Sequence, residues 1–247
     1  MDEPRRAFAG VNGLRLYYEI HGRGRPLVLL HGGVLTLDLM FAPMLPTLAA
    51  RHQVIAVEMQ GHGRTADGRP TMSIDQLADD IVALLAHLEI EEADVFGFSL
   101  GGIVGWSLVM RYPNVVRRLV VASADYRSRE AIPGEVPAPM PTDADFEAMR
   151  AAYQAVAQDP SRFDALQETV GTMVQAFLGW TADEVRAVTT PTLVMVGDND
   201  FIRVRDAAEA AELLPHGQLA VLPGTTHMDM TRSPERILAM VVPFLDA

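Results

Sequence analysis

The chain has 247 residues, of which 49% are apolar and 21% are charged, so it is long and apolar enough for one large core or two small ones, and neither disordered nor fibrous. It contains no cysteine, and its 20 basic residues are all arginine, which excludes disulfides, thiolate metal sites, cysteine nucleophiles and lysine chemistry. The net charge of −12, with scattered arginines, disfavours nucleic acid and anionic membranes as partners.

Two features of the sequence, its first residues and the length of its apolar stretches, bear on where the protein is located in the cell. The polar residues Met1–Arg6 are not followed by the apolar region of a secretory signal. No stretch approaches the ~20 apolar residues of a membrane span. We therefore expect a cytoplasmic protein that acts on a small molecule.

The first part of the chain is typical of strands. Residues Arg5–Val11 and Leu14–Ile20 flank the dipeptide Asn12-Gly13, which predicts a hairpin. The runs Leu27–Leu30 and Val54–Val57 are apolar without alternation, as in strands that helices cover on both faces. We therefore expect a hairpin at the edge of a parallel sheet.

Two helices are predicted next. Leu39–Ala50 can be helical, and a polar loop over residues 60–70 leads to Ser73 and Gln76, whose spacing predicts the capping box of a second helix. The apolar residues that follow recur at helical spacing, so Asp75, Asp79 and Asp80 fall on other faces. We expect these three aspartates to be solvated.

The alternation of strands and helices then continues. Further strands are expected at Ala93–Phe98, Val115–Ala122, Thr192–Val196 and Gln218–Leu222, and further helices at Leu100–Arg111, Val204–Leu214 and Pro234–Phe244, the last capped by Ser233. This pattern predicts an α/β fold with a doubly wound, mostly parallel sheet.

The segment 126–189 interrupts this rhythm between the sixth and seventh strands. It begins with a proline-rich stretch and then shows apolar residues at helical spacing. A helical insertion between two strands can cover a cleft, so we expect residues 126–189 to form a helical lid, or cap. Residues 1–125 and 190–247 would then form the core.

The sequence Gly97-Phe98-Ser99-Leu100-Gly101 follows an expected strand and leads directly into an expected helix. This is the context in which a Gly-x-Ser-x-Gly turn presents a nucleophilic serine. The glycines allow neighbouring backbone to approach, and the helix N-terminus offers N–H groups to an anion. We interpret Ser99 as a nucleophile.

With this motif the chain resembles the α/β-hydrolase family over nearly its whole length. His31-Gly32-Gly33 ends a strand at the place where the family supplies an oxyanion-hole N–H, so the resemblance assigns the two donors to Gly33 and Leu100. Val34 stands where lipase-type relatives have a third glycine, which disfavours bulky tertiary-alcohol esters.

The resemblance also supplies the acid and the base. Asp200 ends the turn after Thr192–Val196 and His227 lies in the loop after Gln218–Leu222, in the chain order that this fold requires. Asp198 and Asp125 remain alternative acids. His31 and His62 are interpreted as loop braces. An imidazole activates the serine, and the carboxylate stabilises the imidazolium.

The function implied is a serine hydrolase of small or medium carboxylic esters or lactones, of carboxylesterase or lactonase type, that uses an acyl-enzyme and needs no cofactor or metal. The pocket is expected to be apolar, with these residues as candidates: Val34, Leu35, Phe98, Trp106, Met140, Phe146, Met149 and Tyr153. The alternatives are a C–C bond hydrolase, a peptidase, a perhydrolase, an acyltransferase, or a small-ligand receptor without turnover.

Overall fold

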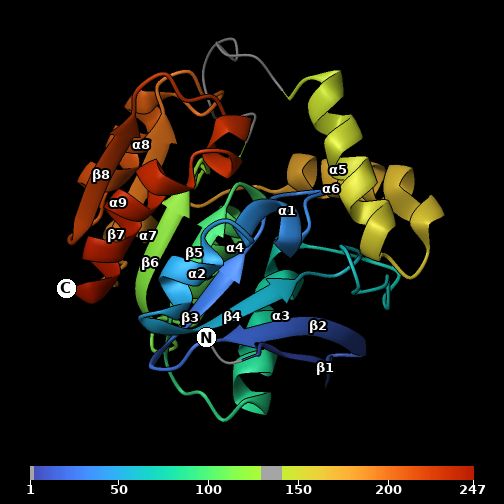
Figure 1. Ribbon diagram of the computed structural model, residues 1–247. Helices are drawn as coiled ribbons and strands as arrows, with labels where there is room; N and C mark the ends of the chain where they lie inside the picture. The colour runs from blue at the N-terminus through green and yellow to red at the C-terminus, as the bar shows by residue number, and fades with distance from the viewer. Residues whose placement is uncertain (1–2, 129–140) are drawn as a thin grey trace.

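An eight-stranded sheet forms the centre of the molecule (Figure 1). The computed structural model describes residues 3–128 and 141–247. The strands are β1 (Arg5–Val11), β2 (Leu14–His21), β3 (Arg25–Leu30), β4 (His52–Glu58), β5 (Ala93–Phe98), β6 (Val116–Ala122), β7 (Thr192–Gly197) and β8 (Gly217–Leu222). Their spatial order is β1-β2-β4-β3-β5-β6-β7-β8. The strand pairs β1–β2 and β2–β4 are antiparallel, and the other pairs are parallel. The predicted mostly parallel α/β sheet is confirmed.

Helices cover both faces of this sheet. The helices of the described residues are α1 (Leu37–Phe41), α2 (Leu45–Ala49), α3 (Ile74–His87), α4 (Leu100–Arg111), α5 (Asp143–Val156), α6 (Phe163–Ala176), α7 (Ala182–Arg186), α8 (Val204–Leu213) and α9 (Pro234–Asp246). Residues of α3, α4 and α8 form one core with the sheet, and residues of α1, α2 and α9 form the other. Within β3, Val28 and Leu30 belong to the first core, whereas Leu27 and Leu29 belong to the second. The unbroken apolar run is thereby explained, because alternate side chains point to opposite faces.

The hairpin turn between β1 and β2 has the predicted geometry. Asn12 and Gly13 both have positive φ, 48° and 81°, as a two-residue hairpin turn requires. Ser73 also caps α3 as expected, because its side chain accepts a hydrogen bond from the Gln76 N–H at 3.2 Å. The Gln76 side chain bonds Thr71 instead, so only half of the capping box forms.

Two local predictions are wrong. The helix expected at Leu39–Ala50 is two five-residue helices, α1 and α2, because proline interrupts a helix at Pro43 and suits only its first turn at Pro46. Ser233 precedes α9 but its side chain makes no capping bond. Its ψ of 56° departs from the extended backbone, ψ 160°, from which Ser73 caps α3.

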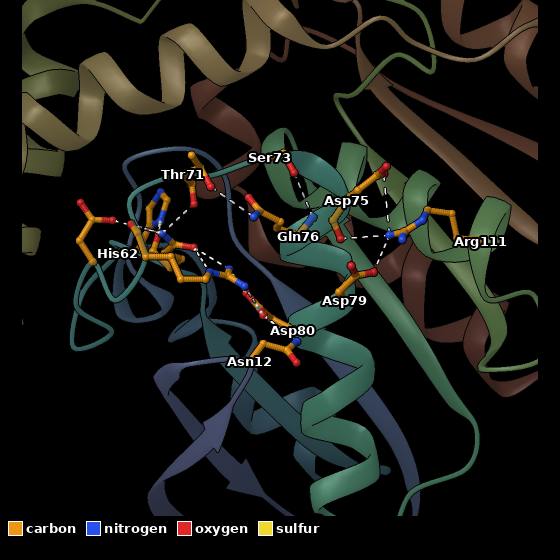
Figure 2. Close-up of polar contacts among 12 residues, drawn as sticks. Asn12, His62, Thr71, Ser73, Asp75, Gln76, Asp79, Asp80 and Arg111 are labelled. Carbon is orange, nitrogen blue, oxygen red and sulfur yellow. Dashed lines mark hydrogen bonds and ion pairs between the residues drawn. The ribbon is translucent and has the colours of Figure 1, made fainter.

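The three aspartates of α3 are not all solvated. Asp80 is buried; it accepts hydrogen bonds from the Arg69 Nη2 at 2.5 Å and from the Asn12 Nδ2 at 3.0 Å. Arg111 lies 2.5 Å from the Asp79 carboxylate and 3.9 Å from that of Asp75 (Figure 2). The Asp75 side chain is 60% exposed. The expectation is wrong for Asp80, because its partners lie on two loops whose approach helical spacing does not reveal.

Helices α5, α6 and α7 lie between β6 and β7 in the chain. In Figure 1, α5 and α6 stand beside each other, and α1 lies next to them and contacts α5. Thr142 and Asp145 form a complete capping box at the start of α5, an arrangement that stabilises a helix by about 1 kcal/mol. In residues 3–128 and 141–247 no helix combines the length and the apolarity needed to cross a bilayer.

Candidate active site

Ser99 occupies the sharp turn between β5 and α4. Its backbone is strained, with φ 52° and ψ −115°. A Cβ at Gly97 would lie 2.1 Å from the carbonyl oxygen of Gly101, and one at Gly101 would lie 2.1 Å from that of Leu30. Both glycines are therefore needed, because they let the helix start directly against the neighbouring strand.

Ser99, His227 and Asp200 form a chain of hydrogen bonds. The Ser99 Oγ lies 3.1 Å from the His227 Nε2, and the His227 Nδ1 lies 3.0 Å from the Asp200 Oδ1. A carboxylate can only accept, so Nδ1 carries the proton and Nε2 is left to accept from the serine hydroxyl. Asp200 and His227 are buried, while Ser99 is partly exposed to a cavity.

The two alternative acids have other partners. Asp198 is exposed and accepts a hydrogen bond from the Thr225 N–H at 3.2 Å. Asp125 forms an ion pair with Arg127 at 2.9 Å. Among the three aspartates considered, the structure brings Asp200 to the imidazole.

Ser123, which carries no sequence motif, holds the Asp200 carboxylate. Its hydroxyl donates to the Asp200 Oδ2 at 2.6 Å, and the Ile202 N–H donates to Oδ1 at 3.0 Å. Ser123 follows β6 and adopts a φ of 54°, which side-chain-bearing residues rarely do. The only sequence signal for it was its place at the carboxyl end of a strand.

Two aromatic rings enclose the imidazole. The Phe201 ring stacks on the His227 ring with centroids 4.1 Å apart, and the Phe98 ring lies 4.8 Å away on a tilted plane. These rings limit the orientations open to the imidazole.

Gly33 and Leu100 line the same cavity as Ser99. The loop after β3 is tied to the start of α4 by a hydrogen bond from the Gly101 N–H to the His31 carbonyl at 3.1 Å. A Cβ at Gly33 would lie 2.8 Å from the Val170 Cγ1 on α6, so this wall leaves no room for a side chain there. Gly33 and Leu100, the residues expected to supply the oxyanion-hole N–H groups, thus lie at one end of the cavity.

Two buried histidines brace this loop, as expected. The His31 Nε2 accepts from the Met59 N–H at 3.2 Å, and the His62 Nε2 accepts from the Val34 N–H at 3.0 Å. Each Nδ1 donates to a backbone carbonyl at 2.8 Å. Val34 has a φ of 54°, an unusual conformation for a β-branched residue, and the bond to His62 helps to hold it.

The His62 brace is itself anchored to α3. The Gln60 carbonyl accepts from the His62 Nδ1, and the Gln60 Oε1 accepts from the Arg69 Nε at 3.0 Å. Arg69 in turn pairs with Asp80 (Figure 2). A continuous series of polar contacts therefore connects the buried aspartate of α3 with the loop that carries Gly33.

Burial keeps both histidines neutral. It lowers the pKa of His62 to about 4 and that of His31 to about 3, the latter also through the proximity of His62. Both folded-state values lie below the unfolded value of about 6.5, so the unfolded chain binds more protons below that pH. The contribution of these lowered pKa values to the free energy of unfolding is therefore fully present above about pH 6.5 and is lost as the pH falls toward about 4.

We expect His62→Gln to destabilise the protein at pH 7.5, and the difference from wild type to shrink by about 2 kcal/mol at pH 5.0. Urea unfolding of both proteins at the two pH values measures this. Burial raises the pKa of Glu58 to about 7, so the stability that depends on Glu58 increases as the pH falls, opposite to that of the histidines. Comparing His62→Gln with wild type at each pH cancels the contribution of Glu58. His87→Gln, on the exposed end of α3, is the control; a pH-independent difference for His62→Gln would contradict the prediction.

The cavity above Ser99 has a volume of about 390 Å³, near the lower end of the usual range for ligand pockets. It lies at the carboxyl ends of the strands, and α5 and α6 supply a further wall. Five predicted residues line it: Val34, Leu35, Phe98, Phe146 and Met149. Val170, Val174 and Phe177, which belong to the apolar residues at helical spacing in the insertion but not to the candidate pocket residues, also line it.

Two predicted pocket residues are wrong. Trp106 is completely buried in the core and packs edge-on against Tyr126, because seven residues of helix carry it about 10 Å from Ser99. Tyr153 is buried against Phe163, one turn of α5 beyond Met149. Met140 lies outside the described residues. Over the described ranges, no group of three or more metal-ligating His, Asp or Glu side chains is found.

The chain is similar to known proteins over most of its length. The sequence model of the alpha/beta hydrolase fold matches residues 25–181. The dihydrolipoyllysine-residue acetyltransferase component of the acetoin cleaving system of Pseudomonas putida is 30% identical over 98% of this chain and 69% of that protein. A protein of Azorhizobium caulinodans named as a carbamate hydrolase, RutD, is 39% identical over 44% of this chain, and the match spans only 40% of that relative.

Solved structures share the fold. A variant of the meta-cleavage product hydrolase CumD from Pseudomonas fluorescens IP01 matches with a TM-score of 0.78 and 24% identity, over 98% of this chain and 97% of that one. At this level of identity the similarity concerns the architecture.

Proposed function

Because this chain belongs to the α/β-hydrolase fold family, we propose that it is a serine hydrolase that cleaves small or medium carboxylic esters or lactones through an acyl-enzyme on Ser99. The observation that carries the proposal is the hydrogen-bond chain from Ser99 through His227 to Asp200, with distances of 3.1 and 3.0 Å, at the edge of an apolar cavity. Such a chain provides a nucleophile, a base and a fixed negative partner.

Acylation would begin with attack of the Ser99 Oγ on the substrate carbonyl carbon. The His227 Nε2 takes the hydroxyl proton, and Asp200 stabilises the resulting imidazolium. The N–H groups of Gly33 and Leu100 donate to the oxyanion. His227 then gives the proton to the leaving alcohol oxygen, which separates from the acyl group.

Deacylation uses the same groups with water. A water molecule gives a proton to the His227 Nε2 while its oxygen attacks the acyl carbon. Collapse of the second tetrahedral intermediate returns the proton to the Ser99 Oγ and releases the carboxylic acid. The partial exposure of Ser99 to the cavity supports access for both substrate and water.

Covalent labelling tests the proposal independently of the natural substrate. A fluorophosphonate should add once to the wild-type protein, with the mass of one phosphonyl group in the intact-mass spectrum, and should not add to Ser99→Ala. The same samples should hydrolyse p-nitrophenyl butyrate only when Ser99 is present. Absence of both the adduct and the turnover would favour the receptor alternative.

A further inference from the structure

Arg127 is the only cationic side chain among the described residues that line the cavity. Its three guanidinium nitrogens all bind carboxylates. The Nε donates to the Asp125 Oδ1 at 3.1 Å, and the Nη2 donates to the Asp125 Oδ2 at 2.9 Å. The Nη2 also lies 2.9 Å from the Asp206 Oδ1, and the Nη1 donates to the Glu209 Oε2 at 3.1 Å.

These contacts fix the guanidinium as well as neutralise it. The Arg127 side chain is 14% exposed, the side chains of Asp125 and Asp206 are 4% and 5% exposed, and the guanidinium lies 5.3 Å from the centre of the Tyr126 ring. To reach Arg127, an anionic ligand would have to displace one of these three carboxylates, of which Asp125 and Asp206 are buried and Glu209 is 49% exposed. It would also approach Asp125, a negative charge in the same cavity wall.

The other described walls offer little to an anion. Phe146, Met149, Val170 and Val174 present apolar surface, and Gln167 of α6 offers an uncharged amide, which binds a carboxylate more weakly than a cation does. The Ser123 hydroxyl donates to Asp200, so it is already committed. In the proposed mechanism the N–H groups of the loop after β3 and of the start of α4 serve the oxyanion, which leaves none for a second negative charge.

We propose that this site selects esters and lactones whose acyl group is uncharged and rejects matched substrates whose acyl group ends in a carboxylate. The inference rests on the proposed function and specifies its substrate class. Its physical basis is the cost of moving a carboxylate from water to apolar surroundings where the one cation of the described cavity wall, Arg127, is already paired. Neutral apolar acyl chains incur no such cost, and they gain from burial against α5 and α6.

Three p-nitrophenyl esters of nearly equal length test the charge selectivity. The hexanoate ends in a methyl group, the monoadipate ends in a carboxylate at the same position, and the methyl adipate ends in an uncharged ester. We expect kcat/KM for the hexanoate to exceed that for the monoadipate by about 100-fold, and the methyl adipate to lie within about tenfold of the hexanoate. The rate with Ser99→Ala is subtracted to remove non-enzymatic hydrolysis.

A gain-of-function variant gives a second measurement. Val174 lines the cavity from α6 and is only partly buried, so Val174→Arg would introduce a cation that has no carboxylate assigned to it. We expect Val174→Arg to raise the monoadipate-to-hexanoate ratio of kcat/KM at least tenfold over Val174→Gln, a neutral polar side chain at the same place.

The outcomes separate the two proposals. Equal kcat/KM for the hexanoate and the monoadipate in wild type would overturn the charge selectivity and leave the hydrolase proposal intact. Rejection of the methyl adipate as well would also overturn it, since length or polarity would then decide selection. No Ser99-dependent turnover of any of the three esters, together with no phosphonate adduct, would overturn both proposals.

Discussion

Ser99→Ala is expected to lower kcat for p-nitrophenyl butyrate by about 10⁵- to 10⁶-fold, the loss seen when a serine nucleophile of this kind is removed. Alanine has no hydroxyl to form the acyl-enzyme, so His227 has no proton to take from this position. The residual rate would come from the oxyanion donors and from substrate binding. Stopped assays with high enzyme concentration, monitored at the absorbance of p-nitrophenolate, give both rates.

The matched control is Ser161→Ala, an exposed serine in the short 3₁₀ turn Pro160–Arg162 before α6. It should keep kcat within about twofold of wild type, because surface substitutions away from the cavity have small effects. Thermal unfolding of both variants shows whether they fold. A folded Ser99→Ala protein with a tenth of the wild-type rate would refute the nucleophile assignment.

Asp200→Asn is expected to reduce kcat by about 10⁴-fold, as loss of the charge behind a histidine base does elsewhere. Asp200 accepts three hydrogen bonds, from Ser123, Ile202 and His227. An asparagine has only one acceptor oxygen, so its NH₂ group would face a donor, and the imidazole would lose the partner that sets its tautomer. Steady-state kinetics should show the loss in kcat rather than in KM.

Asp198→Asn is the control for this substitution. It changes the same chemical group two residues away, on an exposed side chain that accepts a hydrogen bond from the Thr225 N–H. We expect its kcat to stay within about threefold of wild type. If Asp198→Asn lost more activity than Asp200→Asn, the acid would have to be reassigned.

The candidate site could be predicted from the sequence where the backbone packs so closely that only glycine fits. The turn at Ser99 needs glycines at 97 and 101 because backbone atoms lie about 2 Å from where a Cβ would be, and this demand leaves a readable motif. The positions of the central strands could be predicted from uninterrupted apolar runs, because alternate residues of such a strand point into two different cores. Both features depend on neighbouring residues, so they are visible in the sequence.

Features that depend on how distant segments meet were not predictable. Trp106 and Tyr153 are large aromatic residues of the kind that often line pockets. Their positions on their helices instead direct their side chains into the cores. Asp80 looked like a surface residue of an amphipathic helix, yet Arg69 from a loop pairs with it. Ser123 contributes through a single hydroxyl, which no spacing rule identifies.

The polar groups proposed for bond cleavage and the apolar wall come from different parts of the chain. Ser99, Asp200 and His227 follow β5, β7 and β8, whereas Phe146 and Val174 belong to helices inserted between β6 and β7. The insertion is joined to the rest by exposed ion pairs such as Arg162 with Asp67, worth at most about 1 kcal/mol each, and by buried apolar side chains such as Leu166. Under the proposed mechanism, a substitution at Phe146 or Val174 would therefore change the cavity wall without changing any of the three groups that act on the bond.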